Sequence, residues 1–299
     1  MNGNSTNKLY KQIKKISDQM FTIGLWIITS LILVLIFLLL IYILSKGLTK
    51  ISFSFLVGIP SEIDVGGGVG PFLLNSIYVL LISLLISVPI GIGSGVYLSE
   101  YAPNNKLTEF IRSCVESLAS VPSIVIGLFG YVLFVDIFNV GLTIIGAGIT
   151  LSLLNLPVIT RVTEEAIQAI HMDLREASYA MGATKAQTIL KIVIPAALNG
   201  IISGVSLAAS RAFGESALIL LVGGTGTSGE MWDWSLLSPG GTLPVHLWYV
   251  QSEALVEDAS EIAEKTAALL VLITLFLSLS IRFPLWVRDF RFQNKSNKR

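Results

Sequence analysis

Two opposite charges, Arg211 and Glu215, lie four residues apart within an apolar stretch in the second half of the chain. On a helix they would lie one turn apart on the same face. A lone charge at mid-membrane costs at least ~3 kcal/mol, so we expect both side chains to face the interior and to be paired. A guanidinium can bind two oxygens of a tetrahedral oxyanion, and Glu215 would orient it and limit its affinity. The pair therefore indicates a polar pathway for such an anion, a structural ion pair that locks two helices, or both.

A second charged segment, 161–195, lies between two apolar stretches and has the pattern of short helices. Asp173, followed three residues later by Glu176, is a capping-box pattern and predicts a helix start. Thr184 and Gln187 repeat this pattern and predict a second helix. We expect both helices to lie outside the bilayer.

The first of these helices would have a small apolar face made of Ala177, Ala180 and Met181, and Gly182 suits its left-handed end. The second helix would reach Pro195 at the membrane surface. A face of small residues buries little by itself, but it permits close contact with a groove on another protein. The alternative is an interfacial helix that lies on lipid, and the mixed charges of the segment speak against it.

The composition is that of a membrane protein. Hydrophobic residues make up 53% of the chain, charged residues 13%, and the mean hydropathy is +0.75. Because a bilayer is crossed by about 20 residues of helix, six stretches are candidates for spans: 21–44, 72–98, 118–135, 140–159, 198–222 and 267–286. The fold class expected is all-α, a polytopic protein with six transmembrane helices. The first stretch is too long for a signal peptide and has no cleavage site, so we expect it to be retained.

The distribution of Lys and Arg predicts the orientation. Basic residues precede the first stretch and follow the last, so both termini are expected in the cytoplasm. The loops 99–117 and 161–195 are basic and expected inside, whereas the loop 223–262 has six acidic residues, no Lys and no Arg, and is expected outside. Only Lys46 and Lys50 fall in a loop expected outside.

Few residues could serve a metal site or catalysis. Cys114 is the only cysteine, so no internal disulfide is possible. His171 and His246 are expected on opposite sides of the membrane and cannot share a metal. No set of Ser and His, His and Asp or paired carboxylates is expected at one membrane depth, which speaks against an integral-membrane enzyme.

Glycines four residues apart indicate where helices pack closely. Gly91 and Gly95 form one such pair, and Gly200 and Gly204 form another. The run Gly91-x-Gly93-x-Gly95 lies within a membrane stretch with no strand before it, so it does not indicate a nucleotide loop.

The segment 176–195 resembles the EAA signature of ABC importer permeases, E-A-A-x3-G-x9-I-x-L-P. Its matching positions are Glu176, Ala177, Ser178, Gly182, Ile192, Ile194 and Pro195. Ser178 in place of Ala and Ile194 in place of Leu are conservative departures. The resemblance implies a type I ABC importer permease fold in which this segment is the coupling helix that docks into an ATPase.

The resemblance also implies that ATP and Mg²⁺ bind to a separate ATPase homodimer, and that this chain is a non-catalytic subunit with no cofactor of its own. The chain has no G-x-x-x-x-G-K-[ST] sequence. The run 224–230 comes nearest to it, but has Glu230 where the lysine must be.

The residues Arg211, Gly214 and Glu215 resemble the Arg-Ala-x-Gly-Glu pattern of the phosphate branch of these permeases. The segment 242–246 is similar to the A-type subunit of that branch rather than to its C-type sister. The resemblance therefore implies inorganic phosphate as substrate, Arg211, Gly214 and Glu215 in the translocation path, and a heterodimer with a C-type subunit. An extracytoplasmic phosphate-binding protein and the lipid bilayer are further expected partners, and nucleic acid is not.

Two alternatives remain at this stage. The chain could serve another oxyanion, such as sulfate, molybdate or tungstate. A proton-coupled secondary transporter would use Arg211 and Glu215 without an ATPase, but would leave the 176–195 signature unexplained.

The expected organisation has four parts. Residues 1–20 form a cytoplasmic leader, and 21–71 contain the first transmembrane helix and an external loop. Residues 72–287 form the ABC importer transmembrane domain, with the coupling region at 171–195. Residues 288–299 form a cytoplasmic tail.

Overall fold

The computed structural model describes residues 3–61, 65–253 and 256–296, and in these residues the regular structure is helical throughout. The α-helices are α1 (Gly3–Gly47), α2 (Phe53–Val57), α3 (Gly70–Val96), α4 (Lys106–Ala119), α5 (Ser123–Tyr131), α6 (Ile144–Gln168), α7 (Met172–Ala180), α8 (Lys185–Thr188), α9 (Ile194–Phe213), α10 (Ala217–Val222), α11 (Leu243–Ser252) and α12 (Ala259–Ser296). π-Helical turns extend α3 and α5 and join α8 to α9, at Tyr97–Tyr101, Val132–Ile137 and Ile189–Val193.

Among the described residues, five continuous helical segments are long and apolar enough to cross a membrane: Ser17–Lys50, Gly70–Tyr101, Ile144–Gln168, Lys185–Phe213 and Ala259–Phe283. A sixth span exists only if the pair Lys106–Ala119 and Ser123–Ile137 is counted as one, and this pair is bent by 92°. The third span expected over 118–135 therefore includes a bend that the sequence analysis did not predict. Pro122 explains the break, because proline disfavours the helical conformation of the residue before it.

Two other spans differ from the sequence expectation at their ends. The fourth begins at Ile144, because the Thr143 hydroxyl accepts a hydrogen bond from the Gly146 amide at 3.3 Å and caps the helix there. It continues to Gln168, beyond the expected end at 159. The fifth is interrupted after Phe213, so the expected continuous helix over 198–222 is two helices, α9 and α10.

The bundle is built on the packing of α3 against α6. A Cβ on Gly91 would come within 2.8 Å of Ile159, and one on Gly95 within 2.7 Å of the Thr160 carbonyl oxygen. A Cβ on Gly200 would come within 2.8 Å of Ala166 on α6. The glycine pairs therefore mark close helix contacts, as the sequence predicts.

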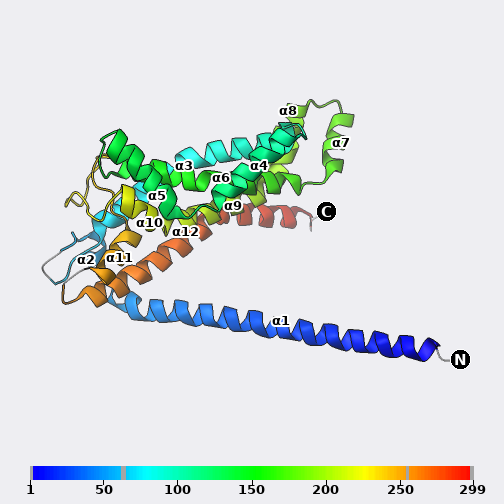
Figure 1. The fold of residues 1–299 in the computed structure, drawn as a ribbon, viewed down its shortest axis with the longest axis horizontal. Coiled ribbons are helices and arrows are strands. Elements are labelled where there is room, and N and C mark those ends of the chain that lie inside the picture. The colour runs from blue at the N-terminus through cyan, green and yellow to red at the C-terminus, as the bar shows by residue number, and fades with distance from the viewer. Residues whose placement is uncertain (1–2, 62–64, 254–255, 297–299) are drawn as a thin grey trace.

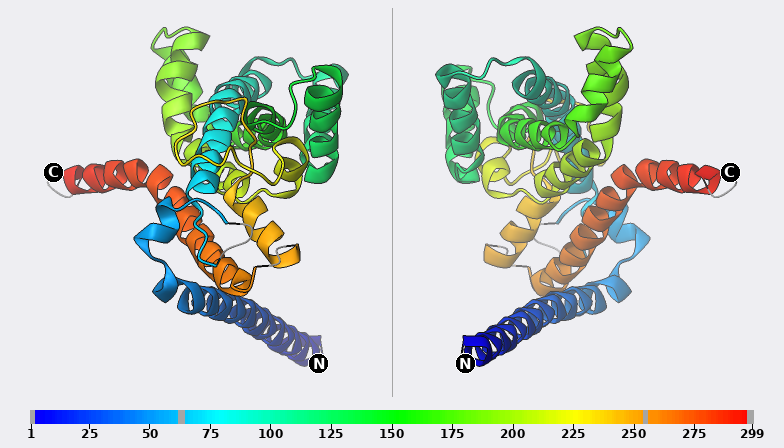
Figure 2. Two further views of the ribbon diagram at one scale, coloured as in Figure 1. Left: turned by 90° about the vertical axis from the view of Figure 1, so that its left-hand side faces the viewer. Right: turned by 90° about the vertical axis from the view of Figure 1, so that its right-hand side faces the viewer.

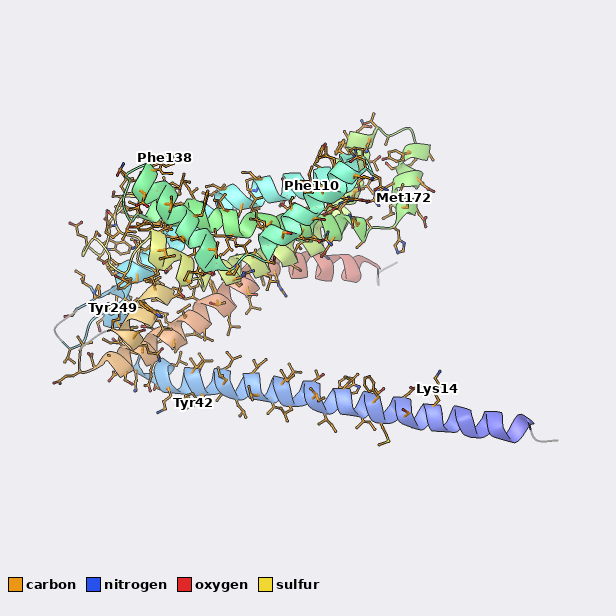
Figure 3. All side chains as sticks on the ribbon, viewed as in Figure 1. Lys14, Tyr42, Phe110, Phe138, Met172 and Tyr249 are labelled. Carbon is orange, nitrogen blue, oxygen red and sulfur yellow. The ribbon has the colours of Figure 1, made fainter. Side chains whose placement is uncertain are left out.

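The first helix lies apart from the bundle along most of its length (Figures 1 and 2). It meets α12 near Gly47, whose Cα faces the Glu264 backbone, and the Lys50 ammonium pairs with the Glu264 carboxylate at 2.7 Å. Side chains project on all sides of α1, with Lys14 and Tyr42 toward its opposite ends (Figure 3). Most of the described apolar side chains of this helix are exposed in the single subunit.

The molecule has two distinct ends (Figure 1). One contains α7, α8 and the outer ends of α1 and α12, and we call it the α7 end. The other contains α2, α11 and the loop 223–242, and we call it the α11 end. The two terminal helices thus finish at the same end of the protein as α7.

Candidate functional site

At the α7 end, α7 presents one face to solvent. Glu176, Ala177, Ala180 and Met181 are exposed, and Met181 is 81% exposed. Ser178 is buried instead, and its hydroxyl shares a 2.9 Å hydrogen bond with Thr188. Glu176, Ala177 and Ser178 all align with the EAA signature. Glu176 and Ala177 are available to a partner, whereas Ser178 joins α7 to α8.

The ends of α7 differ in how well the sequence predicts them. The helix starts at Met172 with His171 as its N-cap and no side-chain cap, so the expected capping box of Asp173 and Glu176 is wrong. Its other end is as expected, because Gly182 has a φ of +82°, the left-handed conformation that glycine adopts without strain.

The second capping box is confirmed. The Thr184 hydroxyl accepts from the Gln187 amide, and the Gln187 side chain accepts from the Thr184 amide. The helical segment that follows reaches Pro195, as expected, and continues beyond it, since Pro195 falls in the first turn of α9. Ile192 is half-buried and Pro195 is exposed. Both lie in one helical segment that leads from the exposed turn into the bundle.

Sequence reasoning missed the role of Arg175. Its side chain is buried and pairs with Glu100 at 2.6 Å, and it also donates to the carbonyl oxygens of Ile170 and Ile167 at 2.7 and 3.0 Å. The sequence did contain one sign of this role: Arg175 lies in a short predicted helix, and the residues beside it form the exposed face of that helix.

The expected helical pair of Arg211 and Glu215 is not formed. Arg211 lies in the last turn of α9, which ends at Phe213, and Glu215 lies in the break before α10. The Glu215 carboxylate accepts a hydrogen bond from the Leu218 amide in the first turn of α10, at 3.4 Å. No ion pair joins the two side chains in the described part of the chain.

Arg211 faces outward from this subunit. Leu207, Arg211 and Gly214 are exposed along the same side of α9, while Glu215 is half-buried. Any path past Arg211 is therefore open on one side and needs a second wall from outside the chain.

At the α11 end, hydrogen bonds hold the loop 223–242 against the bundle. The Asn75 amide of α3 donates to the carbonyl oxygens of Pro239 and Gly241 at 3.2 and 3.1 Å. The first amides of α6, those of Ile144 and Ile145, donate to loop carbonyls at 3.0 Å. The loop is thus fixed on the helix ends, and it exposes Trp232 and Trp234.

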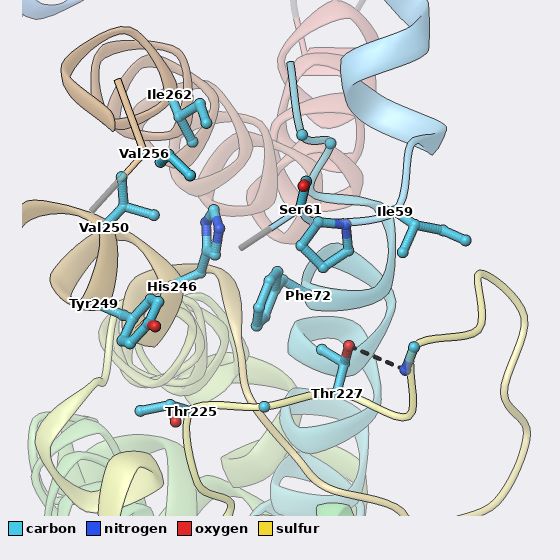
Figure 4. A pocket seen from close by; sticks show the side chains of 15 residues that line it. Ile59, Ser61, Phe72, Thr225, Thr227, His246, Tyr249, Val250, Val256 and Ile262 are labelled. Atoms are coloured by element: carbon cyan, nitrogen blue, oxygen red, sulfur yellow. Dashed lines mark hydrogen bonds between the residues drawn. The ribbon is translucent and has the colours of Figure 1, made fainter. Parts of the chain in front are cut away.

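A cavity of about 270 Å³ lies under this loop (Figure 4). His246 of α11 forms part of its wall, stacks on Phe72 with ring centroids 4.2 Å apart and is 6% exposed. Its Nδ1 has no hydrogen-bond partner among the described residues. Burial lowers the pKa of His246 from 6.5 to about 4, so the imidazole is neutral near pH 7.

Comparisons with known proteins agree with this architecture. The probable ABC transporter permease protein YqgI of Bacillus subtilis is 41% identical over 280 residues, which cover 90% of this chain and 95% of that protein. The phosphate transport system permease protein PstA of Haemophilus influenzae is 32% identical over 239 residues, 80% of this chain and 83% of that protein.

The fold is also similar to that of a chain in an inward-facing structure of the MetNI methionine ABC transporter. The TM-score is 0.58 at 24% identity, over 72% of this chain and 93% of that chain. The family described as binding-protein-dependent transport system inner membrane component matches residues 87–288, which include α7 and the break between α9 and α10. The chain is therefore a multi-pass permease that belongs to this family of ABC transporter membrane components.

Proposed function

We propose that this chain is the A-type permease subunit of an ATP-driven importer of inorganic phosphate. The observation that carries the proposal is the exposed α7, which presents the E-A-S-x3-G sequence to a partner in a chain whose relatives include several phosphate transport permeases. The assignment of phosphate, rather than another oxyanion, as the substrate rests on those relatives and on the Arg211-x-x-Gly-Glu215 pattern.

In this proposal the α7 end faces the cytoplasm, and the exposed face of α7 docks into an ABC ATPase homodimer. The basic residues before the first span and after the last support this orientation. ATP and Mg²⁺ would be bound by the ATPase. The permease itself would contribute the docking helix and the path, without catalytic residues of its own.

The second wall beside Arg211 would come from a C-type permease subunit. An exposed guanidinium within a membrane span is costly in lipid, so a protein surface is expected to cover Arg211, which lies in the last turn of the span that ends at Phe213. Arg211 would then lie at the interface of the heterodimer. There it could make contact with an oxyanion through two N–H donors without a carboxylate already paired to it.

The α11 end would receive an extracytoplasmic phosphate-binding protein. Its loop is held rigidly and exposes two tryptophans, a residue type enriched where proteins bind one another. Most of the substrate selectivity would then be exercised before the anion reaches Arg211.

The test of substrate class is uptake of labelled phosphate in cells that lack their own high-affinity phosphate system. The chain is supplied with its C-type partner, ATPase and binding protein, and excess sulfate or molybdate is added as competitor. Uptake unaffected by either competitor is expected. Competition by sulfate or molybdate would move the assignment to another oxyanion and leave the ABC permease role intact.

A further inference from the structure

Arg175 and Glu100 form a buried ion pair at the α7 end. The two side chains are 9% and 8% exposed, and the Glu100 Oε1 accepts from both Nη2 and Nε of Arg175, at 2.6 and 3.0 Å. Withdrawing two charges from water costs several kcal/mol unless the geometry is good and the remaining donors are satisfied. The carbonyl oxygens of Ile170 and Ile167 satisfy Nη1 and Nη2 here.

These contacts connect three elements through one side chain. Arg175 belongs to α7, and Glu100 belongs to the π-helical turn that ends α3. Ile167 lies in the last turn of α6, and Ile170 lies in the link from α6 to α7. We call this set of contacts the α7 latch.

The two helices that the latch connects to α7, α3 and α6, also pack closely against each other. The α3 and α6 helices pack at van der Waals distance along Gly91 and Gly95. A second ion pair, from the half-buried Arg112 Nε to the buried Glu164 Oε1 at 2.6 Å, ties α4 to α6 nearby. A displacement of the α3 end would therefore carry α6 with it.

The opposite face of α7 is exposed, and its other buried side-chain contact leads along the chain from Ser178 to Thr188 of α8. Movement of the exposed face of α7 can thus be passed to α9 through Ser178, Thr188 and α8. Arg175 joins α7 directly to Glu100 at the end of α3. The α6 helix is also joined to α7 by the chain link 169–171, and Lys185 of α8 lies 4.9 Å from the centroid of the Tyr101 ring in the same π-helical turn.

We propose that Arg175 and Glu100 are a positioning pair that makes α7 and the adjoining ends of α3 and α6 move as one body. This inference rests on the proposed function of α7 as the docking helix. Movement imposed on α7 by the ATPase would then be passed to the second and fourth spans as well as to the fifth.

The first test needs no transported substrate. Spin labels are attached to cysteines at Leu174 and Tyr97, which are both exposed, with Cys114 replaced by Ser, in the full transporter in nanodiscs. With the latch intact, the distance distribution between the labels should stay narrow and unchanged by ATP. Glu100→Gln and Arg175→Gln should each broaden it or make it respond to ATP. An unchanged distribution in both variants would overturn the proposal.

Arg161→Gln is the matched control. Arg161 forms ion pairs with Glu116, Glu164 and Glu165 at the same end, at 3.1, 3.6 and 2.8 Å, and none of these described ion pairs involves α7. Its substitution removes a comparable charge and should leave the distance distribution narrow. Broadening in this variant would show that any charge loss at this end loosens α7.

The second test measures coupling. In the Arg175→Gln and Glu100→Gln variants the ATPase should still co-purify, because the exposed face is intact, while phosphate imported per ATP hydrolysed should fall roughly tenfold. Unchanged coupling would contradict the proposal. If the Gln variants fail to assemble, Arg175→Lys decides. It retains the charge but not the fork of donors, so coupling reduced severalfold is expected and full coupling would overturn the latch.

The two hypotheses fail in different ways. If the wild-type assembly imports no phosphate, the proposed substrate is wrong, but the label distances still report on the latch. If phosphate is imported and the label distances ignore the Gln substitutions, the latch alone is wrong.

Discussion

Arg211 lies in the last turn of α9, and Glu215 lies just before α10. The C-terminal end of a helix attracts a positive charge and the N-terminal end attracts a negative one, so each charge is stabilised by the helix end beside it. The Glu215 carboxylate accepts a hydrogen bond from the Leu218 amide, and the guanidinium of Arg211 has no carboxylate partner among the described residues. An unpaired, exposed arginine is better placed to bind an anion than one locked in an ion pair.

Replacing Arg211 tests this role. Arg211→Ala should reduce phosphate uptake about a hundredfold, because losing hydrogen bonds to a charged group costs about 2–3 kcal/mol. Complex assembly, followed by co-purification of the partner subunits, should be unaffected. Arg161→Ala serves as the control for charge loss at a half-buried site outside α9. Normal uptake by a well-assembled Arg211→Ala transporter would remove Arg211 from the path.

Because His246 is buried, we expect the free energy of unfolding to depend on pH. Its pKa of about 4 in the fold lies below the ordinary 6.5, so between these values the unfolded chain binds more protons than the folded one. The stability contributed by neutral, buried His246 is complete above about pH 6.5 and is lost as the pH falls toward 4. The loss at about pH 5 should be ~2 kcal/mol.

Thermal unfolding of the detergent-solubilised protein measures this effect. The wild type should melt at a clearly lower temperature at about pH 5 than at pH 7, and His246→Gln, which cannot titrate, should show a smaller difference. An equal difference in both proteins would assign the acid sensitivity to other groups.

At the scale of single elements, the turn after α7 depends on one backbone conformation. Gly182 has a φ of +82°, and nothing lies within 4 Å of where its Cβ would be. Substitution there is therefore opposed by backbone strain, about 1–2 kcal/mol, rather than by a clash. Gly182→Val should lower the ratio of imported phosphate to ATP hydrolysed, and Gly182→Asn should be tolerated better because Asn adopts this conformation more readily. Equal behaviour of the two variants would contradict the conformational argument.

The exposed face of α7 is tested by reversing one charge. Glu176→Lys should reduce recovery of the ATPase in pull-down, because Glu176 is exposed on the face proposed to dock. Glu109→Lys, in the first turn of α4, makes the same charge change at another exposed site and is expected to retain the ATPase. Unchanged recruitment by the Glu176→Lys protein would count against docking through this face.

Sequence patterns predicted these elements unevenly, for identifiable physical reasons. The apolar stretches, the left-handed Gly182, the capping box of Thr184 and the glycine contacts follow from local chemistry, and all are found. The break at Phe213 and the bend near Pro122 were missed because hydropathy does not register where a helix is interrupted. The Arg175–Glu100 pair was missed because its partners are 75 residues apart, and no local pattern links them.

At the scale of the whole molecule, this chain is one part of a larger assembly. Most of the described side chains of α1 are exposed beyond its contact with α12, and Arg211 is exposed on α9. The α7 end and the α11 end each present a surface suited to a different partner. Family membership implies an ATPase and a substrate-binding protein as partners, and we propose that they bind at the α7 end and the α11 end. Motion applied at one end would have to pass through the bundle to reach the other.

The central claim is that ATP hydrolysis by a separate subunit drives phosphate through a path that this chain helps to form. The most direct measurement is phosphate entry into proteoliposomes that contain this chain, its C-type partner and the ATPase, with the binding protein outside and ATP inside. We predict entry that requires ATP, the ATPase and the binding protein together, and that a proton gradient alone does not support. Entry driven by a proton gradient without the ATPase would contradict the account and favour a secondary transporter.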